Sequence, residues 1–190
     1  MITVQTGNAR PRHAAPTITR LRAVLLLFAV ALCLALMPAR QAAADELAQP
    51  SGRVILTVEG NISTTNAGDS AQFDRALLES LGTHRVVTGN PWVDGEVEFE
   101  GVLMSRLLEA VGAGSQRFKA VALDGYAVEV KGIDFAKYPV LLALKMDGKY
   151  MSVRNKGPLW IIVPFSDHPE LDVTSSRYIS IWQLTSISVR

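Results

Sequence analysis

A short polar loop that contains an arginine, an asparagine and a lysine in succession separates two apolar segments. The loop Arg154-Asn155-Lys156-Gly157-Pro158 follows residues 150–153 and precedes residues 159–163. Guanidinium, ammonium and backbone N–H groups of a glycine-containing turn can converge on one negative charge. The pattern predicts a site for a small anionic ligand, and its alternative is an ordinary solvated turn.

Two further polar loops lie next to aromatic residues, at positions 88–92 and 124–126. Polar loops beside aromatic rings are typical of the rim of a ligand pocket. We expect Arg154 and Lys156 to contact the anion, and Trp92 and Tyr126 to form the walls. The alternative is that the tryptophans belong to the core. The candidate site residues are Thr88, Asn90, Trp92, Tyr126, Arg154, Asn155 and Lys156.

Other patterns that carry chemistry are weak or absent. After residue 44 only His84 and His168 remain as histidines, without metal-ligand spacing. Glu96, Glu98 and Glu100 alternate along one segment, so that they share one face of a strand. Three carboxylates on one face suit a hard cation such as Ca²⁺, but the more common interpretation is a solvated face with no metal.

The first 44 residues have the layout of a secretory signal peptide. Four arginines in residues 10–22 precede an apolar run of about 15 residues, and Ala42-Ala43-Ala44 supplies a cleavage site. The run is shorter than the ~20 residues of a membrane span, although an uncleaved anchor is the alternative. No two arginines are adjacent, which indicates Sec-type export rather than the twin-arginine route. We therefore expect a periplasmic or secreted protein with no membrane span after cleavage near Ala44.

Removing this leader changes the charge and the chemistry of the chain. It holds five of the 19 Lys and Arg residues, none of the 18 Asp and Glu residues, and the only cysteine, Cys33. Residues 45–190 therefore carry a net charge of −4, which argues against binding nucleic acid. They also contain no thiolate that could act as a metal ligand or nucleophile.

Residues 45–53 are predicted to be a loose segment, and residues 54–190 a single β-rich α+β domain with two short helices. Helical spacing predicts residues 70–81, capped by Asp69, and residues 103–111 as the helices. Asp124-Gly125 and Asp147-Gly148 predict hairpins between short strands. Residues 178–189 read as one strand or two. The predicted core includes Leu77, Leu107, Val121, Val128, Leu142, Ile161 and Trp182.

The order of these segments resembles the molybdopterin-binding domain of the sulfite-oxidase type, and in particular its small exported bacterial members. The resemblance covers about residues 54–190 and implies a compact β-rich fold with loops that bind molybdopterin in full-sized relatives. The motifs that carry it are Pro91-Trp92, Phe99-Glu100-Gly101-Val102-Leu103, Asp124-Gly125-Tyr126, Tyr138-Pro139-Val140-Leu141-Leu142-Ala143, Met146-Asp147-Gly148-Lys149, Lys156-Gly157-Pro158-Leu159-Trp160 and Trp182-Gln183-Leu184.

One departure from this family separates the functional hypotheses. Catalytic relatives bind molybdenum through a cysteine, which in some of them lies four residues before a tryptophan; here Thr88 holds that position before Trp92. A hydroxyl is a poor replacement for a thiolate. The first hypothesis is a non-catalytic ligand-binding or sensory module that signals to a membrane-bound partner. The alternatives are a molybdopterin-dependent oxidoreductase whose metal is held by the dithiolene alone or by an oxygen ligand, and a structural partner-binding domain.

Overall fold

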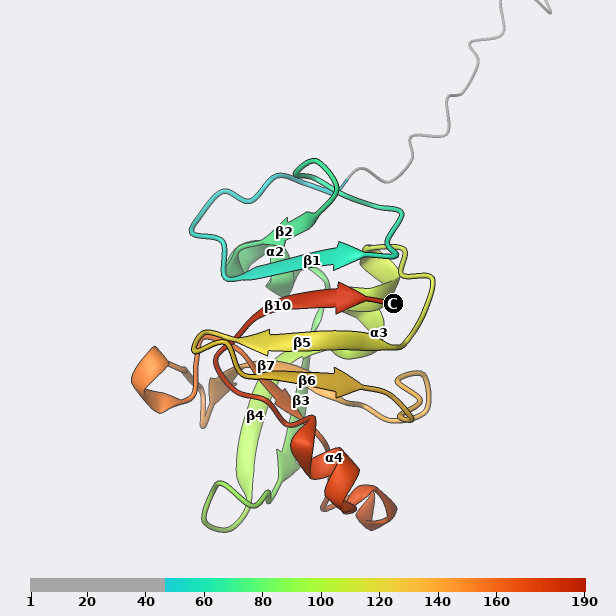
Figure 1. The fold of residues 1–190 in the computed structure, drawn as a ribbon. Helices are drawn as coiled ribbons and strands as arrows, with labels where there is room; N and C mark the ends of the chain where they lie inside the picture. The colour runs from blue at the N-terminus through green and yellow to red at the C-terminus, as the bar shows by residue number, and fades with distance from the viewer. Residues whose placement is uncertain (1–46) are drawn as a thin grey trace, which may run out of the picture. The chain divides into compact units, whose positions relative to one another are not determined.

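The structure is a computed structural model that describes residues 47–190. The predicted signal peptide and its cleavage site near Ala44 lie outside the described residues. Residues 47–190 fold into two β-sheets and three short α-helices, as the α+β prediction requires, with one helix more than predicted (Figure 1). Within this range, no helix is both long and apolar enough to cross a bilayer.

The first sheet has the strand order β2-β1-β10-β5-β6 (Figure 1). β1 and β10 run parallel at its centre, with Thr57 opposite Ser186, and the other pairs are antiparallel. The last strand of the chain therefore lies between two segments that are far away in sequence. The strands are β1 (Leu56–Gly60), β2 (Ala71–Phe73), β5 (Phe118–Ala122), β6 (Ala127–Val130) and β10 (Leu184–Val189).

The second sheet is antiparallel throughout, with the order β3-β4-β7-β8 and with β9 also paired to β7. The predicted Asp147-Gly148 turn joins β7 to β8. Both of its residues have positive φ angles, 49° and 72°, as tight hairpin turns require. The strands are β3 (Thr83–Thr88), β4 (Val97–Leu103), β7 (Leu141–Met146), β8 (Lys149–Tyr150) and β9 (Trp160–Ile162).

The first four residues of β7 are buried on both faces, which explains the apolar run Leu141-Leu142-Ala143-Leu144. Leu142 and Leu144 pack into the main core, which includes side chains of both sheets. Leu141 and Ala143 point to the opposite face and join a second cluster around Phe99 and Trp160. The functional loops that carry Trp92 and Trp182 pack against this second cluster, so β7 connects the core to the candidate site.

The prediction places the start of the first helix too early, at residue 70. Residues 71–73 form β2, which pairs with β1, and the helix α2 covers only Arg75–Ser80. Asp74, not Asp69, is the N-cap: its carboxylate accepts the backbone N–H of Leu77 at 2.8 Å. Leu78 is the fully buried residue of this helix, and Leu77 is partly buried.

The second predicted helix is confirmed as α3 (Met104–Ala110), which is followed by Gly112 with a φ of 57°. A third helix, α4 (Thr174–Tyr178), corrects the prediction of a strand that begins at Tyr178. Arg177 donates two hydrogen bonds, at 2.7 and 2.9 Å, to the carboxylate of Asp172, and these bonds connect α4 to the turn before it. Two short 3-10 helices, η1 (Val153–Asn155) and η2 (Pro169–Leu171), complete the fold.

Three of the seven predicted core residues are completely buried, and the other four are half-buried. Leu107, Leu142 and Ile161 are completely buried. Val121 is half-buried, because β5 turns Phe118, Ala120 and Ala122 inward instead. The side chains of Leu77, Val128 and Trp182 are also half-buried, and each packs against a core cluster.

The segment predicted to be loose is fixed to the domain over its described part. Gln49 donates a hydrogen bond to the carbonyl of Asn66 at 2.6 Å, and Asn66 donates one to the carbonyl of Ala48 at 2.7 Å. Leu47 packs against the main core. Residues 47–53 therefore lack regular structure but have defined contacts.

Candidate functional site

An aromatic-lined pocket of about 330 Å³ lies where three separate segments of the chain meet. The loop after β3 contributes Trp92, the β5–β6 turn contributes Tyr126, and the segment from the end of α4 to the start of β10 contributes Tyr178 and Trp182. We call it the aromatic pocket. Its described lining residues are Trp92, Ala122, Asp124, Tyr126, Tyr178, Ser180, Ile181 and Trp182.

The two predicted wall residues, Trp92 and Tyr126, therefore lie in one pocket. Trp92 is half-buried, and its ring meets that of Trp182 edge to face, with the ring centres 5.7 Å apart. Tyr126 is 51% exposed and lies in the turn of the confirmed Asp124-Gly125 hairpin. Asp124 fixes this turn, because its carboxylate accepts the backbone N–H of Tyr126 at 2.9 Å.

Behind the pocket, the aromatic contacts continue into the protein. The ring of Trp182 meets that of Trp160, with centres 6.3 Å apart, and Trp160 in turn contacts Phe99. Trp160 is completely buried, and its indole N–H donates to the carbonyl of Ser180 at 3.1 Å. The alternative prediction, that the tryptophans are core residues, thus holds fully for Trp160 and in part for Trp92 and Trp182, which are half-buried and pack against the second cluster.

The cationic loop lies on the short helix η1 and not in the aromatic pocket. Arg154 and Asn155 are exposed, and neither lines the pocket. Lys156 follows with a φ of 64°, and its Nζ lies 5.4 Å from the ring centre of Trp160. The loop is anchored to the segment beside the pocket, because the backbone N–H of Gln183 donates to the carbonyl of Lys156 at 3.0 Å.

Thr88, which holds the position of the metal-ligating cysteine in the family resemblance, is completely buried. Its Oγ1 accepts the backbone N–H of Ser166 at 3.1 Å and donates to the carbonyl of Gly89 at 3.0 Å. The Oγ of Ser166 accepts the backbone N–H of Gly89 at 3.1 Å. The hydroxyl therefore joins the end of β3 to the loop after β9, and Thr88 is not among the residues that line the aromatic pocket.

Asn90 lies between Thr88 and Trp92 and shapes the loop that carries the pocket wall. Its Oδ1 accepts the backbone N–H of Trp92 at 2.9 Å. Its Nδ2 is buried and makes no hydrogen bond with a described residue. A buried amide donor without a protein partner is rare in folded proteins.

Tyr178, Ser180 and Ile181 are pocket residues that the sequence prediction missed. Residues 178–189 have the β-branched and aromatic composition of a strand. This composition does not indicate that α4 ends at Tyr178 or that an irregular segment lies between Tyr178 and β10. The signal that could have located them is the neighbouring Trp182, since this residue belongs to a motif of the resemblance.

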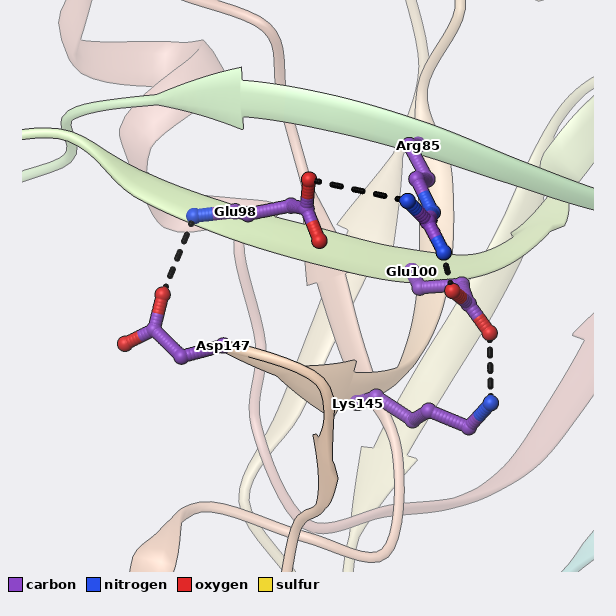
Figure 2. Close-up of polar contacts among 5 residues, drawn as sticks. All are labelled: Arg85, Glu98, Glu100, Lys145 and Asp147. Atoms are coloured by element: carbon purple, nitrogen blue, oxygen red, sulfur yellow. Dashed lines mark hydrogen bonds and ion pairs between the residues drawn. The ribbon is translucent and has the colours of Figure 1, made fainter.

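Two of the three glutamates in the predicted row, Glu98 and Glu100, form ion pairs. Figure 2 shows Glu100 of β4 between Arg85 of β3 and Lys145 of β7. The distance from Arg85 Nε to Glu100 Oε2 is 3.0 Å. Hydrogen bonding from Lys145, and then from Arg85, lowers the pKa of Glu100, while the same carboxylate raises the pKa of Lys145. Within residues 47–190, no group of three His, Cys, Asp or Glu side chains is placed to hold a metal ion.

Comparison with known proteins identifies the class of the domain. The model of the oxidoreductase molybdopterin binding domain family matches residues 65–166, and the chain belongs to this family. The resemblance seen in the sequence is thereby confirmed. No curated protein matches the chain.

The fold is also similar to a solved structure, the sulfane dehydrogenase SoxCD from Paracoccus pantotrophus. The TM-score is 0.52 with 14% sequence identity, over 70% of this chain and 37% of that chain. The sulfite-oxidase-type fold is thereby confirmed. The chain corresponds to little more than a third of the length of that enzyme, and at this identity the similarity concerns the fold alone.

The residues of the described chain do not fit a molybdenum centre held by a protein thiolate. Such a centre needs a cysteine side chain as its ligand, and residues 47–190 contain no cysteine. The hydroxyl that replaces it, that of Thr88, is buried and hydrogen-bonded to Ser166. Any molybdopterin bound here would have to be held without a ligand from this position.

Proposed function

We propose that this protein is an exported ligand-binding or sensory module whose molybdopterin-binding-type domain does not catalyse molybdenum redox chemistry. The observation that carries the proposal is the environment of Thr88, which has neither the sulfur nor the accessibility that a molybdenum ligand needs. A family fold can keep its architecture while its chemistry is lost, because function depends on the residues of the site.

A binding function has support of its own in the aromatic pocket. Tyr126 and Tyr178 are exposed by 51% and 60%, although they are large aromatic residues that gain stability from burial. Both lie at one pocket together with Trp92 and Trp182. Aromatic side chains that gather at a concave surface are typical of ligand sites. In this proposal, ligand binding at the pocket is communicated to a membrane-bound partner.

The experiment measures the melting temperature of the full chain in fractions of a small-molecule extract from its native host. The proposal predicts that at least one fraction raises the melting temperature of the wild type, since a ligand of the folded state stabilises it. The rise should be lost in Trp92→Ala and retained in Tyr150→Ala, because Tyr150 is 44% exposed but lies outside the pocket. If no fraction stabilises the wild type, the protein is a structural or partner-binding domain instead.

Family membership itself favours a second candidate, an oxidoreductase that binds molybdopterin with the metal held by the dithiolene alone or by an oxygen ligand. This candidate predicts about one molybdenum atom per chain in protein from the native host. It also predicts that Thr88→Val retains the metal, because the buried hydroxyl takes no part in binding it.

A further inference from the structure

The aromatic pocket differs in charge from the anion site that the sequence predicted. Its described lining contains one carboxylate, Asp124, and no lysine or arginine. Two basic residues close to it are engaged elsewhere. Arg177, which precedes Tyr178, is bonded to both carboxylate oxygens of Asp172, and Lys156, whose carbonyl accepts the N–H of Gln183, lies against the ring of Trp160. An anion in this pocket would be repelled by the carboxylate of Asp124, and no lysine or arginine among the described lining residues would offset that repulsion.

The four aromatic side chains present several ring surfaces to one small volume. Trp92 and Trp182 meet at an angle of 68° between ring planes and so form a corner. Tyr126 and Tyr178 come from the β5–β6 turn and from α4, and both remain largely exposed. The face of an aromatic ring carries negative electrostatic potential and attracts a cation, most strongly for tryptophan.

Two polar groups of the pocket, the hydroxyl of Ser180 and one carboxylate oxygen of Asp124, are already hydrogen-bonded within the protein. The hydroxyl of Ser180 donates to the carbonyl of Ile161 at 2.7 Å, and Ser180 is buried. One carboxylate oxygen of Asp124 is used by the backbone N–H of Tyr126, and the other has no hydrogen bond with a described residue. The pocket thus offers the rings of four aromatic residues, two tyrosine hydroxyls and one negative charge, and the rings and the charge together suit a cation with a methylated surface.

We infer that the aromatic pocket binds a small organic cation with a methylated ammonium group, whose charge is placed against the ring faces and Asp124. The volume of about 330 Å³ is at the lower end of the range of small-molecule sites, which suits a ligand of this size. A quaternary ammonium group donates no hydrogen bond, so the already occupied hydroxyl of Ser180 costs it nothing. The inference rests on the proposed binding function and specifies the chemical class of its ligand.

The test compares choline with 3,3-dimethyl-1-butanol, which has nearly the same shape but no charge. Binding to the full chain is followed by tryptophan fluorescence, because Trp92 and Trp182 line the pocket. Choline should give a saturable change, and the neutral analogue should bind about tenfold or more weakly. Equal responses to both compounds would show that charge plays no part, and the inference would be wrong.

Three variants identify the groups that recognise the cation. Asp124→Asn keeps an oxygen for the Tyr126 turn but removes the charge, and it should weaken choline binding about tenfold. Tyr126→Ala and Tyr178→Ala should each weaken it, since both rings are exposed and neither is needed for the core. Tyr150→Ala is the matched control and should bind choline as the wild type does. An unchanged affinity in all three pocket variants would overturn the assignment.

The inference and the proposed function fail in different ways. If the host extract stabilises the wild type but neither choline nor tetramethylammonium alters its fluorescence, the pocket binds another class of ligand and the binding function stands. If neither the extract nor the cations have an effect, both are wrong. A choline response that depends on Arg154 and Lys156 rather than on Asp124 would contradict the location of the site.

Discussion

The Oγ1 of Thr88 accepts the backbone N–H of Ser166 at 3.1 Å, and through this bond the loop after β3 is joined to the loop after β9. The two residues are 78 positions apart in the chain. Thr88, which the sequence resemblance places at the metal-ligand position, therefore has a structural role in this protein.

Removing the Thr88 hydroxyl should destabilise the domain. Thr88→Val keeps the shape of the side chain but leaves the N–H of Ser166 without its partner, at an expected cost of about 1–2 kcal/mol in the free energy of unfolding. Urea denaturation measures this difference. Thr88→Ser retains the hydroxyl and is the control. A valine variant as stable as the wild type would mean that the bond between the loops contributes nothing.

The boundary of the first helix leads to a second prediction. Asp74→Ala should destabilise the domain by about 1–2 kcal/mol, because the N-cap of α2 and a partner of the Gly52 N–H are lost together. Asp69→Ala should change stability by less than about 0.5 kcal/mol, since Asp69 is exposed. If thermal or urea unfolding showed Asp69→Ala to be the more destabilising of the two, Asp69 would be the N-cap, as the sequence predicted.

This pair of aspartates shows why the sequence places the helix incorrectly. Ala71, Gln72 and Phe73 fit the apolar spacing of a helix and the alternation of a strand equally well. The choice is made by pairing with β1, which begins 15 positions earlier, and by the carboxylate of Asp74, which binds Leu77 and Gly52. Tertiary contacts of this kind leave no local signal. The hairpins were predictable because Asp-Gly turns carry their own conformational preference.

The pocket was predictable in part for a similar reason. Trp92 and Tyr126 stand beside turn residues that the sequence shows, so their location at a rim could be expected. Tyr178 is at the end of a helix of five residues that has no side-chain cap. Its neighbours favour a strand by composition, and only the folded chain brings it to the same pocket as Tyr126.

The ion pair between Glu100 and Lys145 predicts a pH dependence of stability. The pKa of Glu100 is lowered in the folded state, so its contribution is present above the unfolded pKa and is lost as the pH falls through the folded value. Glu100→Gln should therefore be less stable than the wild type at pH 7. The difference should shrink below about pH 4, in the range where carboxylates titrate.

Urea denaturation at pH 7 and pH 3 measures this difference. Glu98→Gln is the control, because Glu98 is more exposed and lies 4.0 Å from Arg85. A difference between Glu100→Gln and the wild type that stays constant with pH would mean that the charge of Glu100 is not responsible. The raised pKa of Lys145 predicts a corresponding loss at high pH, as the pH rises through its folded-state value.

The exposed cationic loop, which includes Arg154 and Lys156, is still predicted to bind a small anion. Arg154→Ala combined with Lys156→Ala should weaken binding of a small anion, for which inorganic phosphate is the probe, without unfolding the domain. Isothermal titration measures the affinity, and circular dichroism checks the fold. Because neither residue lines the aromatic pocket, choline binding should be unchanged in this variant. An unaltered phosphate affinity would remove the role of the loop as an anion site.

The central claim is that this domain does not hold molybdenum through its own residues, and the most direct measurement is the molybdenum and pterin content of the chain purified from its native host. A catalytic molybdenum enzyme from the same cells, analysed in parallel, shows that the cofactor is available. We predict far less than one molybdenum atom per chain and no bound pterin, because Thr88 is buried and bonded to Ser166. About one molybdenum atom and one pterin per chain would contradict the account and establish the protein as a molybdopterin enzyme.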